Sequence, residues 1–261
     1  MRVLVTGGAG FIGAHTVEAL VRGGAQVAVV DNLLTGRRER VPSGVTFHEA
    51  NIADARFSEI VREVRPEVIY HFAFYVLVPR SVETPLLDID ALAGSVRLLQ
   101  EARALGVRKV VFASSGFLYG NASTPPVTEA APVDPVTPYA LAKHTVEGYL
   151  RFFHRTYGLP HVVLRYAAVY GPGQVTGAMS DYIRTLSGGR QAEIWGDGTK
   201  TRDYVYIDDV VNANLLALAV PPHHPNPVYN IGTGVETTLN DLYGKIAGLL
   251  GVEAHPVYRP D

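Results

Sequence analysis

Three residues in the middle of the chain have types and spacing suited to moving a proton: Ser115, Tyr139 and Lys143. Tyr139 and Lys143 are four residues apart in a stretch of helical periodicity, which places both side chains on one helix face. A phenol has an ordinary pKa of about 10, and a neighbouring ammonium group favours its ionised form. A serine hydroxyl beside it can hold the same substrate oxygen. We therefore expect the trio to remove a proton from an alcohol while hydride leaves the carbon.

The Tyr–Lys pair could be a coincidence of composition, because the chain contains 14 tyrosines. Two features argue against chance. Lysine is rare, with four in the chain, and the helical stretch that carries the pair follows a β-type run that leads into Ser115. A purely structural role becomes the weaker interpretation once the glycine-rich turn near the N-terminus is considered.

That turn, with the sequence GGAGFIG at residues 7–13, joins the first apolar run to the first helical stretch. Its G-x-x-G-x-x-G spacing lets the backbone approach a pyrophosphate, which then lies at the positive N-terminus of the helix. A tight turn without a ligand would show the same spacing. The strand–turn–helix context, with an acid at the end of the next strand, favours a dinucleotide site. The expected contacts are Gly7, Gly10, Phe11, Ile12 and Gly13.

The acid is Asp31, 18 residues after Gly13. A carboxylate here would accept hydrogen bonds from the adenosine ribose and repel a 2′-phosphate, which favours NAD over NADP. Arg37 and Arg38 follow closely and could meet a phosphate, so NADP stays open. The other residues that we expect to contact the cofactor are Asn32, Asn51, Ile52, Phe72, Ala73, Tyr139, Lys143 and Tyr166.

Alternating strand and helix patterns extend to residue 166 and predict a doubly wound parallel α/β sheet of the Rossmann type. Such sheets bind ligands beyond the carboxyl ends of their strands. We expect residues 1–166 to form the NAD-binding domain and residues 167–261 to form a smaller, irregular substrate-binding lobe interleaved with it. Expected strands are Arg2–Thr6, Gln26–Val30, Val45–Glu49, Glu67–His71, Lys109–Ala113, His161–Tyr166, Tyr204–Ile207 and Val228–Ile231. Expected helices are Phe11–Arg22, Ala55–Arg65, Asp90–Leu105, Pro138–Tyr157, Met179–Leu186, Asp208–Ala219 and Leu239–Leu250.

The composition narrows the function further. The 261 residues include no cysteine, which excludes disulfides, a thiolate nucleophile and iron–sulfur clusters. The nine histidines show no metal-ligand spacing, and we predict no metal site. A formal net charge of −2 argues against nucleic-acid binding. Because no apolar run is long enough for a membrane span or a signal peptide, we expect a cytoplasmic protein without a membrane partner.

A set of ordered motifs resembles the extended short-chain dehydrogenase/reductase superfamily, and within it the nucleotide-sugar epimerase/dehydratase family, most of all the UDP-glucose 4-epimerases. The resemblance covers essentially the whole chain. The motifs, in order, are GGAGFIG, Asp31-Asn32-Leu33, Ser115 through Tyr119-Gly120, Tyr139 to Lys143, Leu164-Arg165-Tyr166, Val169-Tyr170-Gly171-Pro172, Arg202-Asp203-Tyr204 and Asp208-Asp209-Val210.

The resemblance implies catalytic roles for Ser115, Tyr139 and Lys143. Tyr139 would deprotonate the 4-hydroxyl of a nucleotide sugar, bound NAD would take hydride from C4, and the transient 4-keto sugar would turn and receive hydride on its other face. Ser115, Tyr139, Ala168 and Arg202 would contact the substrate, with Arg202 on the diphosphate. The resemblance also implies a homodimer, and a second lobe that continues beyond Asp261 in relatives.

The residues that follow Ser115 separate reactions within the family. The 4,6-dehydratases carry an Asp-Glu pair there, whereas this chain has Gly116-Phe117-Leu118 and so lacks the acid and base for water loss. Ser115 is also outside any G-x-S-x-G elbow, which excludes a serine hydrolase. An epimerase is therefore expected. A nucleotide-sugar reductase or dehydrogenase with net NAD(H) turnover, and a non-catalytic NAD-binding module, remain open.

Four positions depart from the family pattern. Phe74 stands where Ala or Gly is usual, Asn51 where Asp is usual, and Ala91 and Ala168 where Asn is usual. Losing such an amide costs about 0.5–1.5 kcal/mol of binding, which a dinucleotide's many contacts can offset. The departures indicate a reshaped sugar pocket. The apolar segment Phe74–Pro79 is expected to form a packed lid or a specificity wall beside the sugar.

Overall fold

The computed structural model describes residues 1–75, 78–121, 125–225, 227–253 and 255–260. It divides into two compact units: residues 1–166 with 208–231, and residues 167–207 with 232–261. The division differs in one respect from the one expected at residue 166. Residues 208–231 belong to the first unit, because the strand that ends them extends the central sheet of that unit.

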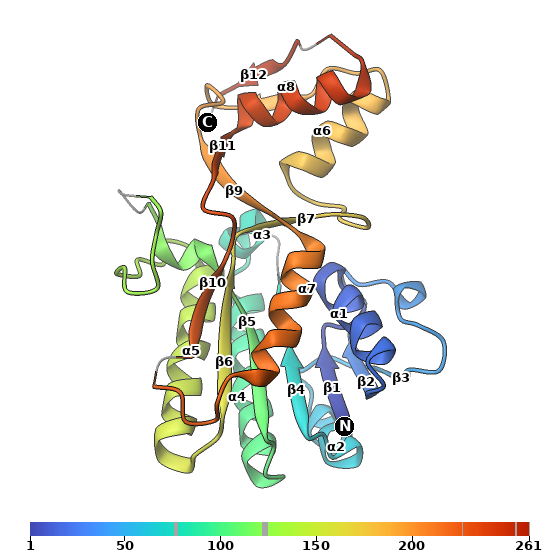
Figure 1. Ribbon diagram of the computed structural model, residues 1–261, viewed down its shortest axis with the longest axis vertical. Coiled ribbons are helices and arrows are strands. Elements are labelled where there is room, and N and C mark those ends of the chain that lie inside the picture. Colours follow the sequence, from blue (N-terminus) through green and yellow to red (C-terminus); the bar gives the residue numbers. More distant parts are fainter. Residues whose placement is uncertain (76–77, 122–124, 226, 254, 261) are drawn as a thin grey trace. The chain divides into compact units, whose positions relative to one another are not determined.

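A seven-stranded sheet forms the centre of the first unit (Figure 1). The strand order is β10-β6-β5-β4-β1-β2-β3, and all six pairings are parallel. Buried parallel strands require near-continuous apolar runs, and the sequences of β1, β2 and β5 show them. The doubly wound sheet predicted from the sequence is confirmed. Its strands are β1 (Arg2–Thr6), β2 (Gln26–Asp31), β3 (Thr46–Glu49), β4 (Val68–His71), β5 (Lys109–Ser115), β6 (His161–Tyr166) and β10 (Val228–Ile231).

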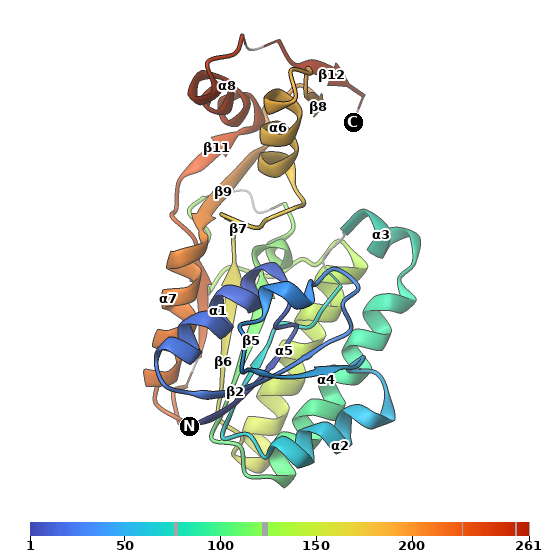
Figure 2. The ribbon, with the colours of Figure 1, turned by 90° about the vertical axis from the view of Figure 1, so that its right-hand side faces the viewer.

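Helices cover both faces of this sheet (Figure 2). Helices α1 and α7 lie on one face, and α2, α4 and α5 lie on the other. A core of apolar side chains lies between the sheet and the second group and includes Leu4, Phe57, Leu98 and Phe112. The helices are α1 (Phe11–Arg22), α2 (Ala55–Val64), α3 (Val78–Glu83), α4 (Leu86–Ala104), α5 (Pro138–Tyr157) and α7 (Ile207–Leu216), with short 3-10 turns η1 (Arg38–Arg40), η2 (Gly116–Tyr119) and η3 (Ala217–Ala219).

Two differences in element ends matter for the site. The helix expected to start at Asp90 begins at Leu86, directly after Pro85. The strand expected to end at Ala113 continues through Ser115, so this serine is the last residue of β5.

Among its described residues, the second unit contains two small sheets and two helices that pack together. One sheet has the order β11-β9-β7, and β12 pairs with β8 in the other. Tyr182 and Tyr243 meet edge to face, with ring centroids 5.5 Å apart, in a small core between the helices. The elements are β7 (Ala168–Tyr170), α6 (Ala178–Ser187), β8 (Glu193–Trp195), β9 (Thr201–Tyr206), β11 (Glu236–Thr238), α8 (Leu239–Leu250) and β12 (Val257–Arg259).

None of the helices in the described ranges is both long and apolar enough to cross a membrane.

Candidate functional site

The predicted chemistry of the first unit gathers along one edge of its sheet. Following the strand order from β5 to β3, the carboxyl ends lead into Ser115, Ala73, Gly7, Asp31 and Asn51 in turn. The order of connection reverses between β1 and β4, the kind of crevice at which doubly wound sheets bind their ligands. Gly7 and Ser115, 108 positions apart in the sequence, thus share a single edge.

The glycine-rich turn is built so tightly that Gly7 and Gly13 have no room for a side chain. A Cβ on Gly13 would lie 2.1 Å from the Gly7 carbonyl oxygen, and one on Gly7, whose φ is +72°, would lie 2.7 Å from the backbone nitrogen of Ala73. Gly10 is the N-cap of α1, and no described side chain caps that helix. The backbone can therefore come close to a ligand, and the first-turn amides of α1 are suited to receive a pyrophosphate.

Asp31 ties the end of β2 to the same turn. Its carboxylate oxygens accept hydrogen bonds from the backbone amides of Ala9 (2.9 Å) and Leu33 (2.8 Å). Burial raises the pKa of Asp31, and these amides act in the opposite direction. Because each carboxylate oxygen has a second lone pair, the side chain can still accept a hydrogen bond from a ribose hydroxyl.

A chain of hydrogen bonds under the end of β4 holds the loop that contains Ala73. Ser95 donates its hydroxyl proton to the Ala91 carbonyl oxygen (2.7 Å), so it accepts from Nε2 of His71 (2.8 Å). Nδ1 of His71 then accepts from the Thr6 hydroxyl (2.7 Å), whose oxygen also receives the Ala73 amide (3.3 Å). Burial, followed by the charge of Lys143, lowers the pKa of His71 to about 3, which keeps the ring neutral.

Five further residues that the sequence predicts to contact the cofactor make contacts within the protein itself. The Asn51 side chain caps the Ala53 amide (3.1 Å) ahead of α2, and Asn32 accepts from the Leu34 amide in an exposed turn. Ile52 is buried against Gly94, and Phe72 stacks on Tyr70. The hydroxyl of Tyr166 donates to the buried Asn214 side chain (2.6 Å). Their contacts with a cofactor remain predictions.

Ser115, Tyr139 and Lys143 come together between the end of β5 and the first turns of α5. All three are buried, with 6%, 6% and 2% of their surfaces exposed. The Lys143 ammonium donates to the Ala113 carbonyl oxygen at 2.5 Å, which ties α5 to the strand that ends at Ser115. The serine and the Tyr–Lys pair, 24 residues apart in sequence, therefore lie at one place.

Aromatic rings surround the lysine. Its Nζ lies 4.0 Å from the ring centroid of Phe74, 4.7 Å from that of Phe112 and 5.8 Å from that of Tyr139. Phe74, one of the departures from the family pattern, also meets Tyr139 edge to face at 6.1 Å. Of the apolar segment expected as a lid, Val76 and Leu77 lie outside the described residues.

The acid–base properties differ from the simple expectation. Burial raises the pKa of Tyr139 to about 12, while the Ser115 hydroxyl acts in the opposite direction and the Asp88 charge adds to the increase. Burial lowers the pKa of Lys143 to about 7, against the attraction of Glu147 and Asp88. In the free protein, loss of water around the phenol therefore dominates its pKa, and the expected phenolate, which also depends on a positively charged nicotinamide nearby, stays a prediction.

One buried network beside the trio could not be recognised from the sequence motifs. Glu147, one helical turn after Lys143, accepts hydrogen bonds from the Ser114 hydroxyl (2.6 Å) and from Arg165 on β6 (2.7 and 3.0 Å). Arg165 also donates to the Tyr119 hydroxyl (2.8 Å). The repeat of functional types at 139, 143 and 147 was a signal that could have revealed it. The network fixes the packing of α5 on β5 and β6.

The other two predicted substrate residues, Ala168 and Arg202, both lie in the second unit, on the paired strands β7 and β9. The Arg202 guanidinium donates to the Thr201 carbonyl oxygen at 2.8 Å. Next to it, Asp203 accepts from the amides of Thr233 and Gly234 and holds the turn before β11.

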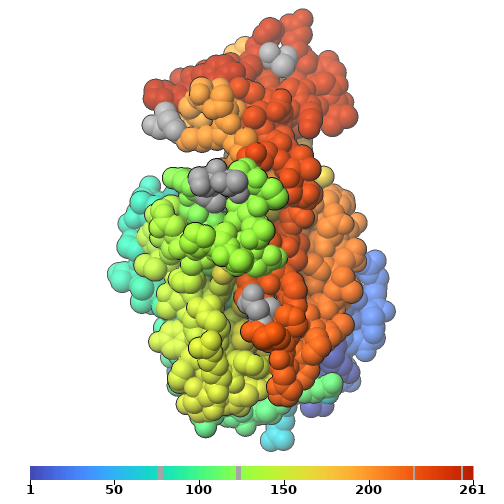
Figure 3. All heavy atoms as spheres, turned by 60° about the vertical axis from the view of Figure 1, so that its left-hand side comes forward, coloured from blue at the N-terminus to red at the C-terminus, as the bar shows by residue number. Residues whose placement is uncertain are grey.

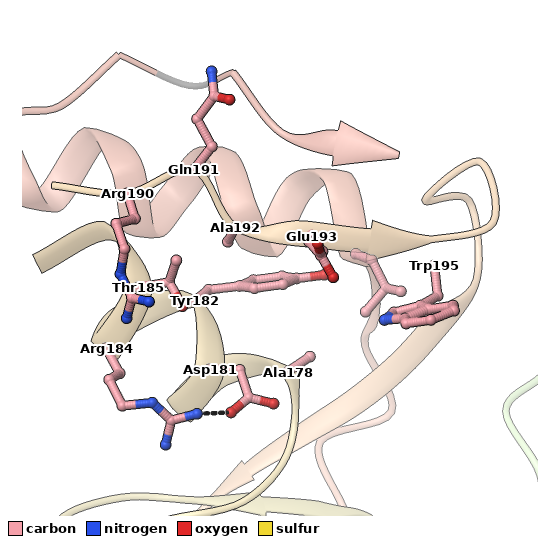
Figure 4. A pocket seen from close by; sticks show the side chains of 11 residues that line it. Ala178, Asp181, Tyr182, Arg184, Thr185, Arg190, Gln191, Ala192, Glu193 and Trp195 are labelled. Atoms are coloured by element: carbon pink, nitrogen blue, oxygen red, sulfur yellow. Dashed lines mark hydrogen bonds and ion pairs between the residues drawn. The ribbon is translucent and has the colours of Figure 1, made fainter. Parts of the chain in front are cut away.

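A pocket of about 540 Å³ lies between α6 and β8 of the second unit (Figure 4). The rings of Tyr182 and Trp195 lie at it, and Arg184 forms an ion pair with Asp181 at 2.5 Å. Guanidinium groups and aromatic faces suit a planar or anionic ligand. Its lining residues are Ala178, Asp181, Tyr182, Arg184, Thr185, Arg190, Gln191, Ala192, Glu193, Trp195 and Leu239.

Comparison with known proteins agrees with this arrangement. Residues 3–232 match the sequence profile of the NAD dependent epimerase/dehydratase family. The UDP-glucose 4-epimerase of Mycolicibacterium smegmatis is 41% identical over 271 residues, covering 100% of this chain and 86% of that protein. Among solved structures, the UDP-glucose 4-epimerase of Thermotoga maritima with UDP-glucose is 41% identical with a TM-score of 0.95, covering 100% of this chain and 86% of that chain.

The Thermus thermophilus UDP-glucose 4-epimerase, in complex with NAD, is similar with a TM-score of 0.92 and 39% identity, over 100% of this chain and 86% of that chain. The resemblance inferred from the motifs is confirmed by these matches. The chain belongs to the NAD-dependent epimerase/dehydratase family.

Proposed function

We propose that this protein catalyses the NAD-dependent epimerisation of a nucleotide sugar at C4, with UDP-glucose and UDP-galactose as the substrate pair. The observation that carries the proposal is the placement of Tyr139 and Lys143, one turn apart on α5, beside Ser115 at the sheet edge that also carries the glycine-rich turn. Relatives named UDP-glucose 4-epimerase support the choice of reaction and nucleotide.

The residues present fit NAD. The glycine turn admits a pyrophosphate at α1, and Asp31 offers an acceptor for the ribose hydroxyls and would repel a 2′-phosphate. When bound, NAD supplies a hydride acceptor and donor, and its positive nicotinamide ring favours a phenolate nearby.

The protein's own groups handle the proton. The phenol oxygen of Tyr139 takes the proton of the sugar 4-hydroxyl and later returns it, while the Ser115 hydroxyl holds the same sugar oxygen. The Lys143 ammonium supplies positive charge near the phenol, and the Phe74, Phe112 and Tyr139 rings around it exclude water. Because no carboxylate follows Ser115, elimination of water from the sugar is not catalysed, and the 4-keto sugar is reduced again.

We assign the nucleotide end of the substrate to the second unit. Arg202, with its planar guanidinium, suits the diphosphate. Trp195, 59% exposed at the pocket of Figure 4, offers a face on which a base can stack. Ala168 stands where the family pattern has an amide, so its side chain offers the sugar no hydrogen bond. A cytoplasmic location belongs to this proposal and rests on the composition.

The family resemblance also supports a homodimer formed through α4 and α5. The outer surface of α5, open to solvent in Figure 3, presents Leu141, Tyr149 and Phe152 with 55%, 38% and 48% of their surfaces exposed. A shallow groove of about 400 Å³ runs along it beside Gly148. Sedimentation velocity should show a dimer, and Phe152→Glu should give a folded monomer. A wild-type monomer at micromolar concentration would contradict the assignment.

The function is tested by incubating the purified protein with a panel of UDP-sugars and identifying products by NMR. Interconversion of UDP-glucose and UDP-galactose without accumulation of NADH is the expected result. Stoichiometric NADH would favour the dehydrogenase alternative, and NAD binding without any turnover would favour a binding module. Tyr139→Phe should retain NAD but lose about 10²–10⁴-fold in kcat, since it removes the acid–base group. Undiminished activity in this variant would refute the mechanism.

A further inference from the structure

A buried carboxylate behind the Tyr–Lys pair has no place in the mechanism above. Asp88, in the first turn of α4, is 1% exposed. Its Oδ2 accepts a hydrogen bond from the Ser81 hydroxyl at 2.6 Å. Its Oδ1 is buried and accepts no hydrogen bond from any residue that the structure describes. An unpaired buried carboxylate oxygen destabilises a fold, so its presence in a native core calls for an explanation.

Ser81, on α3, connects this carboxylate to the backbone of Tyr139. The serine is fully buried, and its oxygen accepts the Tyr139 amide at 2.9 Å while its proton goes to Asp88. The first turn of α5 is otherwise completed by Thr137, whose hydroxyl accepts the Ala140 amide, and by Pro138, which has no amide to satisfy. The Ser81 contact is thus what satisfies the Tyr139 amide at the end of the helix.

The charge of Asp88 is also positioned to act on the pair. It favours the ammonium form of Lys143 and disfavours the phenolate form of Tyr139. The other acid near the lysine, Glu147, is paired with Arg165 at 2.7 Å. His71, the remaining titratable neighbour, has its pKa lowered to about 3 by burial and is neutral. Among the described residues, Asp88 is the carboxylate close to the pair that has no cation of its own.

We propose that Ser81 and Asp88 are positioning residues for the reaction: Ser81 holds the backbone of Tyr139 at the start of α5, and the buried Asp88 carboxylate, which accepts the Ser81 hydroxyl, places a negative charge beside the Tyr–Lys pair. The proposal deepens the function given above and rests on it for the role of Tyr139. The proposal explains why Oδ1 of Asp88 has no hydrogen-bond partner among the described residues. A cation bound to this carboxylate would cancel the negative charge that acts on Lys143.

Two substitutions separate the two roles. Asp88→Asn keeps an oxygen that can accept the Ser81 hydroxyl but removes the charge. Ser81→Ala keeps the charge but leaves the Tyr139 amide without its acceptor. Asp90→Asn is the matched control, because Asp90 is an exposed acid on the same helix.

The charge can be measured without any turnover. The chain has four lysines, so labelling the lysine Cε with ¹³C gives few NMR signals, and the Lys143 signal is the one missing in Lys143→Met. In the NAD-bound protein, Asp88→Asn should lower the Lys143 titration midpoint by about 1 pH unit, and Asp90→Asn should leave it unchanged. An unchanged midpoint in Asp88→Asn would overturn the electrostatic part of the proposal.

Activity then tests the positioning part. Ser81→Ala should lower kcat at least tenfold with little change in KM, whereas Asp88→Asn should shift the pH profile of kcat to lower pH. If kcat of a folded Ser81→Ala protein equals that of the wild type, Ser81 does not position Tyr139. If the wild type epimerises no sugar, the proposed function fails, yet the NMR titration still decides the role of Asp88.

Discussion

Replacing Lys143 by methionine should make the free protein more stable. Burial lowers the pKa of this lysine from 10.5 to about 7, so between these values the unfolded chain binds more protons than the folded one. The stability of the wild type therefore rises with pH across this window. At pH 8 the buried lysine costs about 3 kcal/mol, from about 2.5 pKa units at 1.36 kcal/mol each. Methionine removes this cost and can fill the same space among the aromatic rings.

Urea unfolding of NAD-free protein at pH 7, 8, 9 and 10 would measure the effect. The variant should exceed the wild type by a few kcal/mol at pH 7–8, and the difference should shrink toward pH 10. Lys245→Met, at an exposed position of α8, is the control and should change nothing. A Lys143→Met protein less stable than the wild type at pH 7–8, or a wild-type stability that is flat from pH 7 to 9, would refute the reasoning.

Further variants test other parts of the site. Lys109→Met should cost about 1–3 kcal/mol in urea unfolding, because the lysine donates to three backbone carbonyls that follow α7 at 2.5–3.0 Å, and exposed Arg108→Met should not. Gly13→Ala should abolish NAD binding measured by calorimetry, since its Cβ would lie 2.1 Å from a backbone oxygen of the turn. Arg165→Met should cost about 3–5 kcal/mol in thermal or urea unfolding by leaving a buried carboxylate unpaired, and Glu147→Gln in the same protein should recover part of it.

The elements that carry local signals could be predicted from the sequence. The helices Phe11–Arg22, Pro138–Tyr157 and Leu239–Leu250 begin and end at the expected residues, because each has apolar periodicity and clear boundaries. The short strands of the second unit, such as β7 and β8, were not foreseen. A run of three residues is too short for its pattern to distinguish a strand from a loop. These strands form by pairing with β9 and β12, which lie far along the chain and which the local sequence does not indicate.

For the candidate site, too, the residues with a local signal could be predicted and the buried partners that the fold brings to them could not. The glycine-rich turn and the Tyr–Lys pair can be recognised in the sequence by their spacing. The structure brings these predicted residues of the first unit to one edge of its sheet. Asp88 was missed because the expected helix began at Asp90, so the acid fell outside it. Glu147 and Arg165 were missed because a buried ion pair looks like two surface charges until the fold joins them. The effect of burial on the pKa values of Tyr139 and Lys143 could not be predicted for a related reason, since burial is a property of the folded chain alone.

The polar groups around Lys143 can be understood as an arrangement of charge. A protonated His71 would repel the ammonium, and the hydrogen bonds that tie its two nitrogens to Thr6 and Ser95 fix it as a neutral ring. Asp88, on α4, adds a negative charge that raises the pKa of Lys143. Burial pushes the lysine toward its neutral form, and the charges of Glu147 and Asp88 act against that tendency. The charge of Lys143 is therefore set by the whole arrangement, which is why a Tyr–Lys spacing alone does not define the site.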